Sequence, residues 1–265
     1  MKFQYKALVA ALALSAATVP AQAAFTLSGS GDSSFFLTVV DNTNNISALF
    51  DLGYSNSEFS TMVAQAASSG GALSWDLSKG DYADAWNTFW GTASNSASLQ
   101  WGVMSADNFG GGAGSRNLIA TYEKGTKMVG SQFNNTLSAF DEYLAANQNL
   151  GNHASVANGA SSAISGAAFA ENAKAYGTSG RINQQGFDTT TVLGGTMTIR
   201  QLVNGATNTT ALTETTLGNT NGNYTFSLNS AGVLTFAAPV PEADSYAMLL
   251  AGLGVIGLVA RRRKA

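Results

Sequence analysis

Two pairs of carboxylates and a single histidine are the side chains of this 265-residue chain whose types and spacing suit chemistry. The pairs are Asp81 with Asp84 and Asp141 with Glu142. Glycosidases hold two carboxyl groups roughly 5–10 Å apart across a sugar, so each pair is a candidate for that reaction. However, Asp81 and Asp84 stand at a predicted helix start, with Asp81 as its N-cap, and Asp141 and Glu142 fit the solvated face of a helix. We therefore predict no catalytic pair.

His153, the only imidazole, lies in a polar loop and would have to be the base of any Ser-His-Asp triad. No G-x-S-x-G elbow accompanies it, so we predict a solvated loop histidine. The chain has no cysteine, which excludes disulfides, thiolate metal sites and cysteine nucleophiles, and one histidine nearly excludes histidine-based metal sites. We expect no catalytic residue, no metal and no cofactor, and hence a protein that is not an enzyme.

Two polar segments are similar to ligand loops but lack residues that those loops need. Residues 41–45 (DNTNN) begin like a calcium loop, yet the required glycine and the final glutamate are missing. Residues 109–115 (FGGGAGS) are rich in glycine, yet no Lys-Ser/Thr follows, and Arg116 stands where a calcium repeat has aspartate. We predict a turn and a flexible connection.

The four tryptophans, Trp75, Trp86, Trp90 and Trp101, lie close together in the sequence. Exposed aromatic rings stack on sugars, so a carbohydrate-binding platform is one interpretation, which requires at least two exposed and roughly coplanar rings. The other interpretation is hydrophobic core, because each aromatic ring buries about 150–250 Å². Helical spacing gathers the rings around Trp86 on one face, so we favour the core.

Strand and helix patterns predict the elements that position these residues. Residues 33–40 and 46–52 are predicted to form a hairpin. Apolar residues recur at helical spacing over 81–90 and 131–147, and residues 99–104 alternate as a strand.

The rest of the middle region is less strongly patterned. An Ala/Ser/Gly-rich stretch contains a weak helix at 167–176. Short strands separated by turn residues are predicted at 189–193, 196–203, 211–217, 224–228 and 233–236. Together, these elements predict a mainly β, β-sandwich-like ectodomain over residues 24–239, with a helical insertion at about 81–176.

The first residues have the three zones of a secretory signal peptide. A positive start and an apolar run precede the small residues Ala21 and Ala23, which form a small-x-small cleavage signal. Residues 1–23 are therefore predicted to be a signal peptide, read by the secretion translocon and removed by signal peptidase. Ala24 is the expected mature N-terminus.

Residues 240–265 combine a short motif, an apolar run and a basic cluster. The 15-residue apolar run 246–260 would reach about 22 Å as a helix, short of the ~30 Å hydrocarbon core, so we predict a short transmembrane helix. The basic cluster holds its end in the cytoplasm, which places residues 24 to about 241 outside the inner membrane. The motif residues are Val240, Pro241, Glu242 and Ala243. The basic residues that stop the helix are Arg261, Arg262, Arg263 and Lys264.

This ending, VPEADSYAMLLAGLGVIGLVARRRKA, resembles the PEP-CTERM sorting signal of Gram-negative bacteria. Pro241 and Glu242 match the more constant pair of the motif, and Ala243 stands where the family most often has a second proline. The resemblance implies an exosortase, a membrane-embedded cysteine transpeptidase, as a partner that cuts near the motif. It also implies a temporary inner-membrane anchor and export in exopolysaccharide-producing, biofilm-forming bacteria. The segments SFFLTVVD…FDLG and SLNSAGVLTFAAPVPE are similar to ectodomains with the same signal, and this similarity brings no activity.

The net charge of the predicted ectodomain differs from that of the whole chain, because the two sorting ends are basic. Seven of the 13 basic residues and 14 of the 16 acidic residues lie between the ends, so the ectodomain carries about −7 against −3 for the chain. This excludes a nucleic-acid partner and disfavours anionic polysaccharide as a direct electrostatic partner. We expect a structural or adhesive protein of the cell surface or extracellular matrix, with exopolysaccharide or other matrix components as partners. The alternative is a secreted polysaccharide-binding or polysaccharide-active protein that uses surface tryptophans or paired carboxylates.

Overall fold

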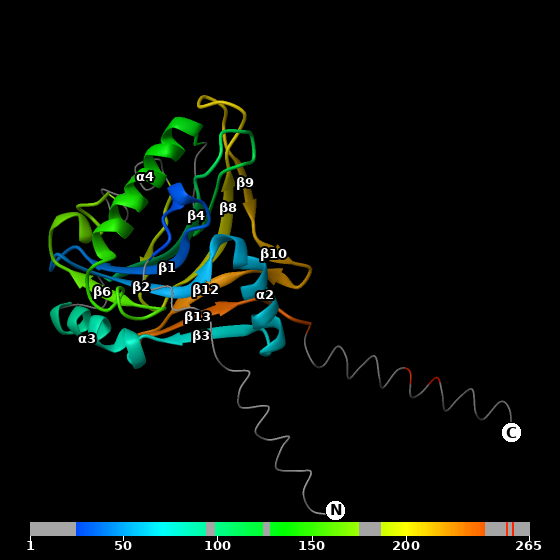
Figure 1. Ribbon diagram of the computed structural model, residues 1–265. Helices are drawn as coiled ribbons and strands as arrows, with labels where there is room; N and C mark the ends of the chain where they lie inside the picture. Colours follow the sequence, from blue (N-terminus) through cyan, green and yellow to red (C-terminus); the bar gives the residue numbers. More distant parts are fainter. Residues whose placement is uncertain are drawn as a thin grey trace, which may run out of the picture.

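A computed structural model describes residues 25–93, 99–123, 128–174, 187–241, 253 and 256. Its centre is one antiparallel sheet in the order β3-β13-β12-β8-β5-β4-β1-β2-β6, with β7 on β4 and β9 on β8; β10 and β11 pair separately (Figure 1). The strands are β1 (Ser34–Asp41), β2 (Ile46–Ser55), β3 (Ala72–Asp76), β4 (Gln100–Asp107), β5 (Asn117–Thr121), β6 (Ala160–Ala163), β7 (Thr191–Val192), β8 (Thr196–Val203), β9 (Thr213–Thr216), β10 (Gly218–Asn219), β11 (Gly222–Asn223), β12 (Thr225–Leu228) and β13 (Val233–Ala237).

The predicted hairpin is confirmed, and its strands β1 and β2 lie between β4 and the edge strand β6. Almost every residue of β1 is buried, as expected for a strand covered on both faces. The turn is held by Asp41, whose carboxylate accepts hydrogen bonds from the backbone N–H of Thr43 at 2.9 Å and from the Asn44 side chain at 2.7 Å. Residues 41–45 are therefore a turn, as predicted.

The two faces of the sheet bury two separate hydrophobic cores. Phe35 and Leu37 of β1 point into the inner core, which also holds Phe236 of β13. Phe36 points the other way, into an outer core covered by α4 (Gly130–Asn147), where it lies 6.4 Å from the Phe140 ring. Alternate residues of one strand thus serve both cores, as the two-residue period of a strand dictates.

The sheet curls so that its ends approach one another. The Trp75 indole N–H, at the β3 end, donates to the Leu52 carbonyl of β2 at 3.1 Å. Phe59 of α2 (Phe59–Ser68) contacts strands from both parts of the curled sheet. Its ring lies 5.9 Å from the Phe35 ring of β1 and 6.1 Å from the Phe236 ring of β13. The mainly β fold class is confirmed. The β-layers of the domain belong to one curled antiparallel sheet.

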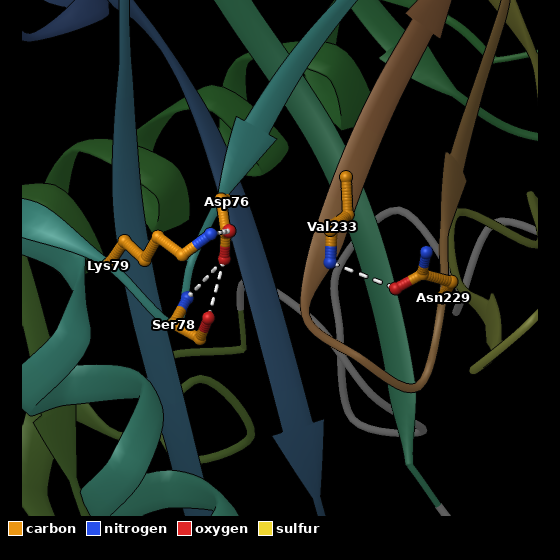
Figure 2. A network of polar contacts seen from close by, with 5 residues as sticks. All are labelled: Asp76, Ser78, Lys79, Asn229 and Val233. Atoms are coloured by element: carbon orange, nitrogen blue, oxygen red, sulfur yellow. Dashed lines mark hydrogen bonds and ion pairs between the residues drawn. The ribbon is translucent and has the colours of Figure 1, made fainter.

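The turn after β3 lies beside the β12–β13 hairpin (Figure 2). Asp76 accepts hydrogen bonds from the N–H and hydroxyl of Ser78 and forms an exposed ion pair with Lys79 at 2.7 Å. In the hairpin, Asn229 accepts from the Val233 N–H at 3.0 Å. Each of these contacts joins residues of the same turn, so the side chains of Asp76 and Asn229 stabilise the backbone conformation of their turns.

The helices confirm part of the predicted pattern. α3 (Ala83–Thr92) and α4 match the predicted helices, whereas α2 was not predicted. The N-cap assigned to Asp81 is wrong: Asp81 lies inside a 3-10 turn, η3 (Gly80–Tyr82), and Tyr82 precedes α3 without a side-chain cap. The other described 3-10 turns are η1 (Ser28–Ser30), η2 (Asn56–Glu58) and η5 (Gly166–Ala168).

Residues 81–176 belong to the sheet as well as to the helices. Besides α3 and α4 they contain β4, β5 and β6, which pair with β1, β8 and β2. The segment expected as a helical insertion is therefore interwoven with the sheet. In place of the weak helix at 167–176, the described residues up to Lys174 form η5 and turns.

Both predicted sorting ends fall almost wholly outside the described residues. Residues 1–24 are not described, and of the apolar run 246–260 only Leu253 and Ile256 are, both helical and exposed. Within the described part of the chain, no helix combines the length and the apolar character needed to cross a bilayer.

Candidate functional site

A cavity of about 290 Å³ lies between α3 and β6 and brings together the carboxylates of Asp81 and Asp84. Both side chains are exposed at its rim. The remaining lining residues are small or polar, a composition that suits hydroxyl-rich ligands better than apolar ones: Ala85, Thr88, Gly151, Asn152, Ala160, Ser161 and Ser162.

Asn152 joins the two sides of this cavity. Its side-chain amide donates to the Asp81 carbonyl at 2.7 Å, and its side-chain oxygen accepts from the Ala160 N–H at 2.7 Å. Gly151 beside it has a φ of +57°, and an added Cβ would stand 1.9 Å from the Ala160 carbonyl oxygen. Only glycine fits there, so the loop before β6 is tied closely to both α3 and the sheet.

Behind the cavity lies a buried polar network around His153. The Asn147 amide donates to the carbonyls of Tyr143 and Ala168, which turns its oxygen toward Ser161. The Ser161 hydroxyl donates to that oxygen at 2.7 Å and lies 3.0 Å from His153 Nε2. Because the hydroxyl proton is directed at Asn147, Nε2 is the donor to Ser161. The histidine therefore does not activate this serine as a nucleophile.

The prediction of a solvated His153 is wrong. The side chain is 3% exposed, and its ring lies 4.3 Å from the Phe25 ring. Burial lowers the pKa of His153 to about 4, so the imidazole is neutral near pH 7. The polar neighbours in the sequence gave no sign of this, because the cover comes from the N-terminal segment.

The second carboxylate pair is divided by the fold. Asp141 accepts hydrogen bonds from the backbone N–H groups of Ser28 at 2.7 Å and Gly29 at 2.9 Å, so it anchors η1 to α4 and is not simply a solvated residue. Glu142 is exposed and lines a separate cavity of about 210 Å³ with Lys174. The two carboxylates therefore have different surroundings and tasks.

Asp51 is a buried carboxyl that the sequence analysis missed. It is 7% exposed on β2 and accepts from the Gly53 N–H at 2.8 Å, while the Tyr82 hydroxyl donates to its backbone carbonyl. Burial raises the pKa of Asp51 to about 7, although the hydrogen bonds from Gly53 and Ser34 oppose this. The sequence signal that could have indicated this buried carboxyl is the position of the aspartate inside the apolar run ALFDL.

The tryptophans do not form a platform of two exposed rings. Trp101 and Trp86 are buried, and Trp75 is half-buried against the inner core. Trp90 is 39% exposed and stacks on Trp86 at 5.6 Å with an interplanar angle of 14°, so the coplanar partner of the exposed ring is itself covered. Among these four rings the core interpretation fits better.

The last strand leads directly into the predicted sorting motif. β13 ends at Ala237, and the Ala238 N–H donates to the Gly71 carbonyl at 2.8 Å. The Asn219 side chain donates to the Pro239 carbonyl at 2.8 Å. Val240 is 36% exposed and Pro241 is exposed.

The other motif and cleavage residues lie outside the described residues, so the structure leaves their roles as predictions. They are Ala21, Ala23, Ala24, Glu242, Ala243, Arg261, Arg262, Arg263 and Lys264.

Comparison with known proteins identifies the end of the chain. The PEP-CTERM protein-sorting motif matches residues 239–264. No curated protein and no solved structure matches the chain significantly. The match begins two residues after β13 ends, so the folded domain and the motif meet without a spacer. The chain thus carries a PEP-CTERM sorting motif, which implies an exported protein with a membrane-associated precursor and an exosortase as its processing partner.

Proposed function

We propose that the described domain is a structural or adhesive component of the cell surface or extracellular matrix in an exopolysaccharide-producing bacterium. The sorting motif holds the precursor at the inner membrane until an exosortase cuts the chain. The observation that carries the proposal is the junction at residues 237–239, where the last strand ends and the motif begins. A cut beyond this junction releases the complete sheet.

The side chains of the domain favour binding over catalysis. Two carboxylates hold backbone segments of the fold: Asp141 anchors η1, and the buried Asp51 accepts the Gly53 N–H. The exposed strand β9 carries Thr213, Thr215 and Thr216, whose short polar side chains suit contact with hydroxyl-rich polymers. With a charge of about −7, the domain favours neutral rather than anionic matrix components.

A second candidate is saccharide binding in the cavity between α3 and β6. Its volume of about 290 Å³ stands at the lower end of the range of ligand pockets, and the lining of Asp81, Asp84, Asn152 and Ser162 offers acceptors and donors to sugar hydroxyls. Acid–base catalysis needs two carboxyl groups in contrasting environments. Asp81 of η3 and Asp84 of α3 are both exposed, so their environments do not contrast, which favours binding over hydrolysis.

Release of the domain tests the first proposal. The full chain is expressed in its exosortase-containing host and in a strain lacking the enzyme, and the domain is measured in membrane and extracellular fractions. We expect extracellular domain only with the enzyme, and retention in the membrane when Pro241 and Glu242 are both replaced by alanine. Ser230→Ala, in the exposed β12–β13 turn, is the control. Equal release in both strains would refute exosortase sorting.

Polysaccharide retention tests the second proposal. The purified domain is passed over immobilised neutral exopolysaccharide from the host. If the cavity binds sugar, Asp81→Asn together with Asp84→Asn will reduce retention at unchanged thermal stability, whereas Glu142→Gln in the other cavity will not. Equal retention of both proteins would remove the cavity as the binding site.

A further inference from the structure

The outer edge of β6 borders the cavity between α3 and β6. β6 is the last strand of the sheet, and within the described chain it pairs only with β2. The Asp51 N–H donates to the Gly159 carbonyl at 3.0 Å, so residues 159, 161 and 163 direct their backbone groups to β2. The alternate residues, Ala160 and Ser162, therefore direct their N–H and carbonyl groups away from the sheet.

Asn152 already occupies part of this edge in the way that a further strand would. Its N–H donates to the Ala160 carbonyl at 3.2 Å, and its side-chain oxygen accepts from the Ala160 N–H at 2.7 Å. Among the described residues, the Ser162 N–H and carbonyl have no such partner. Ser162 is half-buried and lines the cavity. An outward pair of backbone groups on an edge strand is what an extended peptide binds when it adds a strand to a sheet.

The two walls of the cavity leave room for such a peptide. β6 has the sequence ASSA, which contains none of the lysines or prolines that protect exposed strand edges, and its small side chains let another backbone approach. The opposite wall is helical (Figure 1). There Asp84 and Thr88 are four residues apart on α3 and so share one face. We call the space between this face and the outer edge of β6 the β6 groove.

The side chain opposite Ser162 determines which peptide fits the β6 groove. Residues paired across neighbouring strands place their side chains on the same face of the sheet. Ser162 shares the face of Ala160, which belongs to the inner core together with Trp86 of α3. The peptide residue opposite Ser162 would therefore project toward α3, where Asp81 and Asp84 stand exposed at the rim. None of the described residues that line the cavity is basic.

We propose that the β6 groove binds an extended peptide segment of another protein, with a lysine or arginine opposite Ser162 and in contact with Asp81 and Asp84. This partner goes beyond the proposed matrix role and does not depend on exosortase sorting. A second copy of the domain is a poorer occupant, because each copy carries about −7 and the groove is itself acidic. The saccharide considered above would occupy the same cavity and is the competing ligand.

Peptide binding to the purified full chain, measured by fluorescence polarisation, tests the charge preference. The probe is a labelled, end-blocked peptide of sequence Thr-Val-Lys-Val-Thr, whose β-branched residues favour an extended backbone. The control peptide has glutamate in place of lysine. We expect the lysine peptide to bind about tenfold more tightly, and Asp81→Asn together with Asp84→Asn to reduce this preference to about twofold or less. Glu142→Gln, in the other cavity, should leave the preference unchanged.

Two variants of Ser162 test the pairing of the backbone. Ser162→Pro removes the outward N–H, which the ladder with β2 does not use. Ser162→Ala keeps that N–H, removes only the hydroxyl and is the matched control. At melting temperatures close to that of the natural chain, we expect Ser162→Pro to weaken binding of the lysine peptide about fivefold, the factor that corresponds to one net hydrogen bond. Ser162→Ala should bind as the natural chain does.

The outcomes separate the possible occupants. Equal binding of the lysine and glutamate peptides, or binding of neither, overturns the inference even if Ser162→Pro fails to fold. Equal binding by folded Ser162→Pro and Ser162→Ala also overturns it. Retention of neutral exopolysaccharide that depends on Asp81 and Asp84, without binding of the lysine peptide, assigns the cavity to a saccharide and leaves the second proposal for the function standing.

Discussion

Two buried titratable side chains, Asp51 and His153, should make opposite contributions to the pH dependence of stability. Burial raises the pKa of Asp51 from 3.8 to about 7 and lowers that of His153 from 6.5 to about 4. The domain therefore buries a protonated carboxyl and a neutral imidazole over the same range of pH. Both groups are under 10% exposed, so solvent screening is weak.

The sign of each contribution follows from the protons bound in the folded and unfolded states. The folded state keeps the Asp51 proton up to about pH 7 while the unfolded state loses it near 3.8, so this stabilisation is full below pH 3.8 and lost as the pH rises to 7. The unfolded state binds a proton on His153 below pH 6.5 while the folded state does not, so this stability is full above pH 6.5 and lost as the pH falls to 4.

Between about pH 4 and 6.5 each group changes the free energy of unfolding by roughly 1.4 kcal/mol per pH unit, with opposite signs. The two slopes nearly cancel in the natural chain. Asp51→Asn removes the falling contribution, so its slope becomes about 1.4 kcal/mol per unit more positive than that of the natural chain. His153→Gln removes the rising contribution, and its slope becomes more negative by a similar amount.

Urea denaturation of the domain at pH 4.5, 5.5 and 6.5, followed by tryptophan fluorescence, measures these slopes. The comparison uses differences from the natural chain, so exposed groups that titrate in all proteins drop out. The double variant should restore a slope near that of the natural chain. Single variants that both keep the natural slope would refute the reasoning, because neither group would then titrate differently in the folded and unfolded states.

Two further substitutions have expected costs that the structure sets. Gly232→Ala should lower the free energy of unfolding by about 2 kcal/mol or more in urea denaturation, because φ is +80° and the new Cβ would lie 2.7 Å from the Trp86 ring. Gly111→Ala is the control and should be near neutral, since a Cβ at Gly111 would lie in open space. Asp141→Ala removes the acceptor of two backbone N–H groups of η1 and should cost about 2–3 kcal/mol in the same assay, whereas Glu142→Ala should cost under about 0.5. A loss for either control as large as for its partner would contradict the contacts assigned.

The elements that could be predicted are those with strong periodic patterns. β1 and β2 have runs of β-branched and aromatic residues, and α4 carries apolar residues at helical spacing. β6, in contrast, is the segment ASSA, which has no strand pattern of its own. It becomes a strand because the exposed edge of β2 offers it partners, a tertiary effect that local propensity does not contain.

The candidate site was predictable only in part for the same reason. Asp81 and Asp84 are close in sequence, so their proximity at the start of α3 could be predicted. The cavity also needs Asn152 and β6, which are distant along the chain. The burial of His153 depends on Phe25, more than a hundred residues away. Only the arrangement of the sheet brings these segments together.

The hydrophobic cores explain why the positions of the two processing cuts matter. Phe25 belongs to the outer core, and Ala238 belongs to the inner core. The predicted signal-peptide cut leaves Phe25 as the second residue of the mature chain, and the sorting motif begins at residue 239, directly after Ala238. Cuts before Phe25 and after Ala238 would leave the cores complete, whereas cuts a few residues further inward would remove a core residue. A domain without cysteine depends on packing and strand pairing alone, so its stability requires that both sorting ends lie outside the residues that fold.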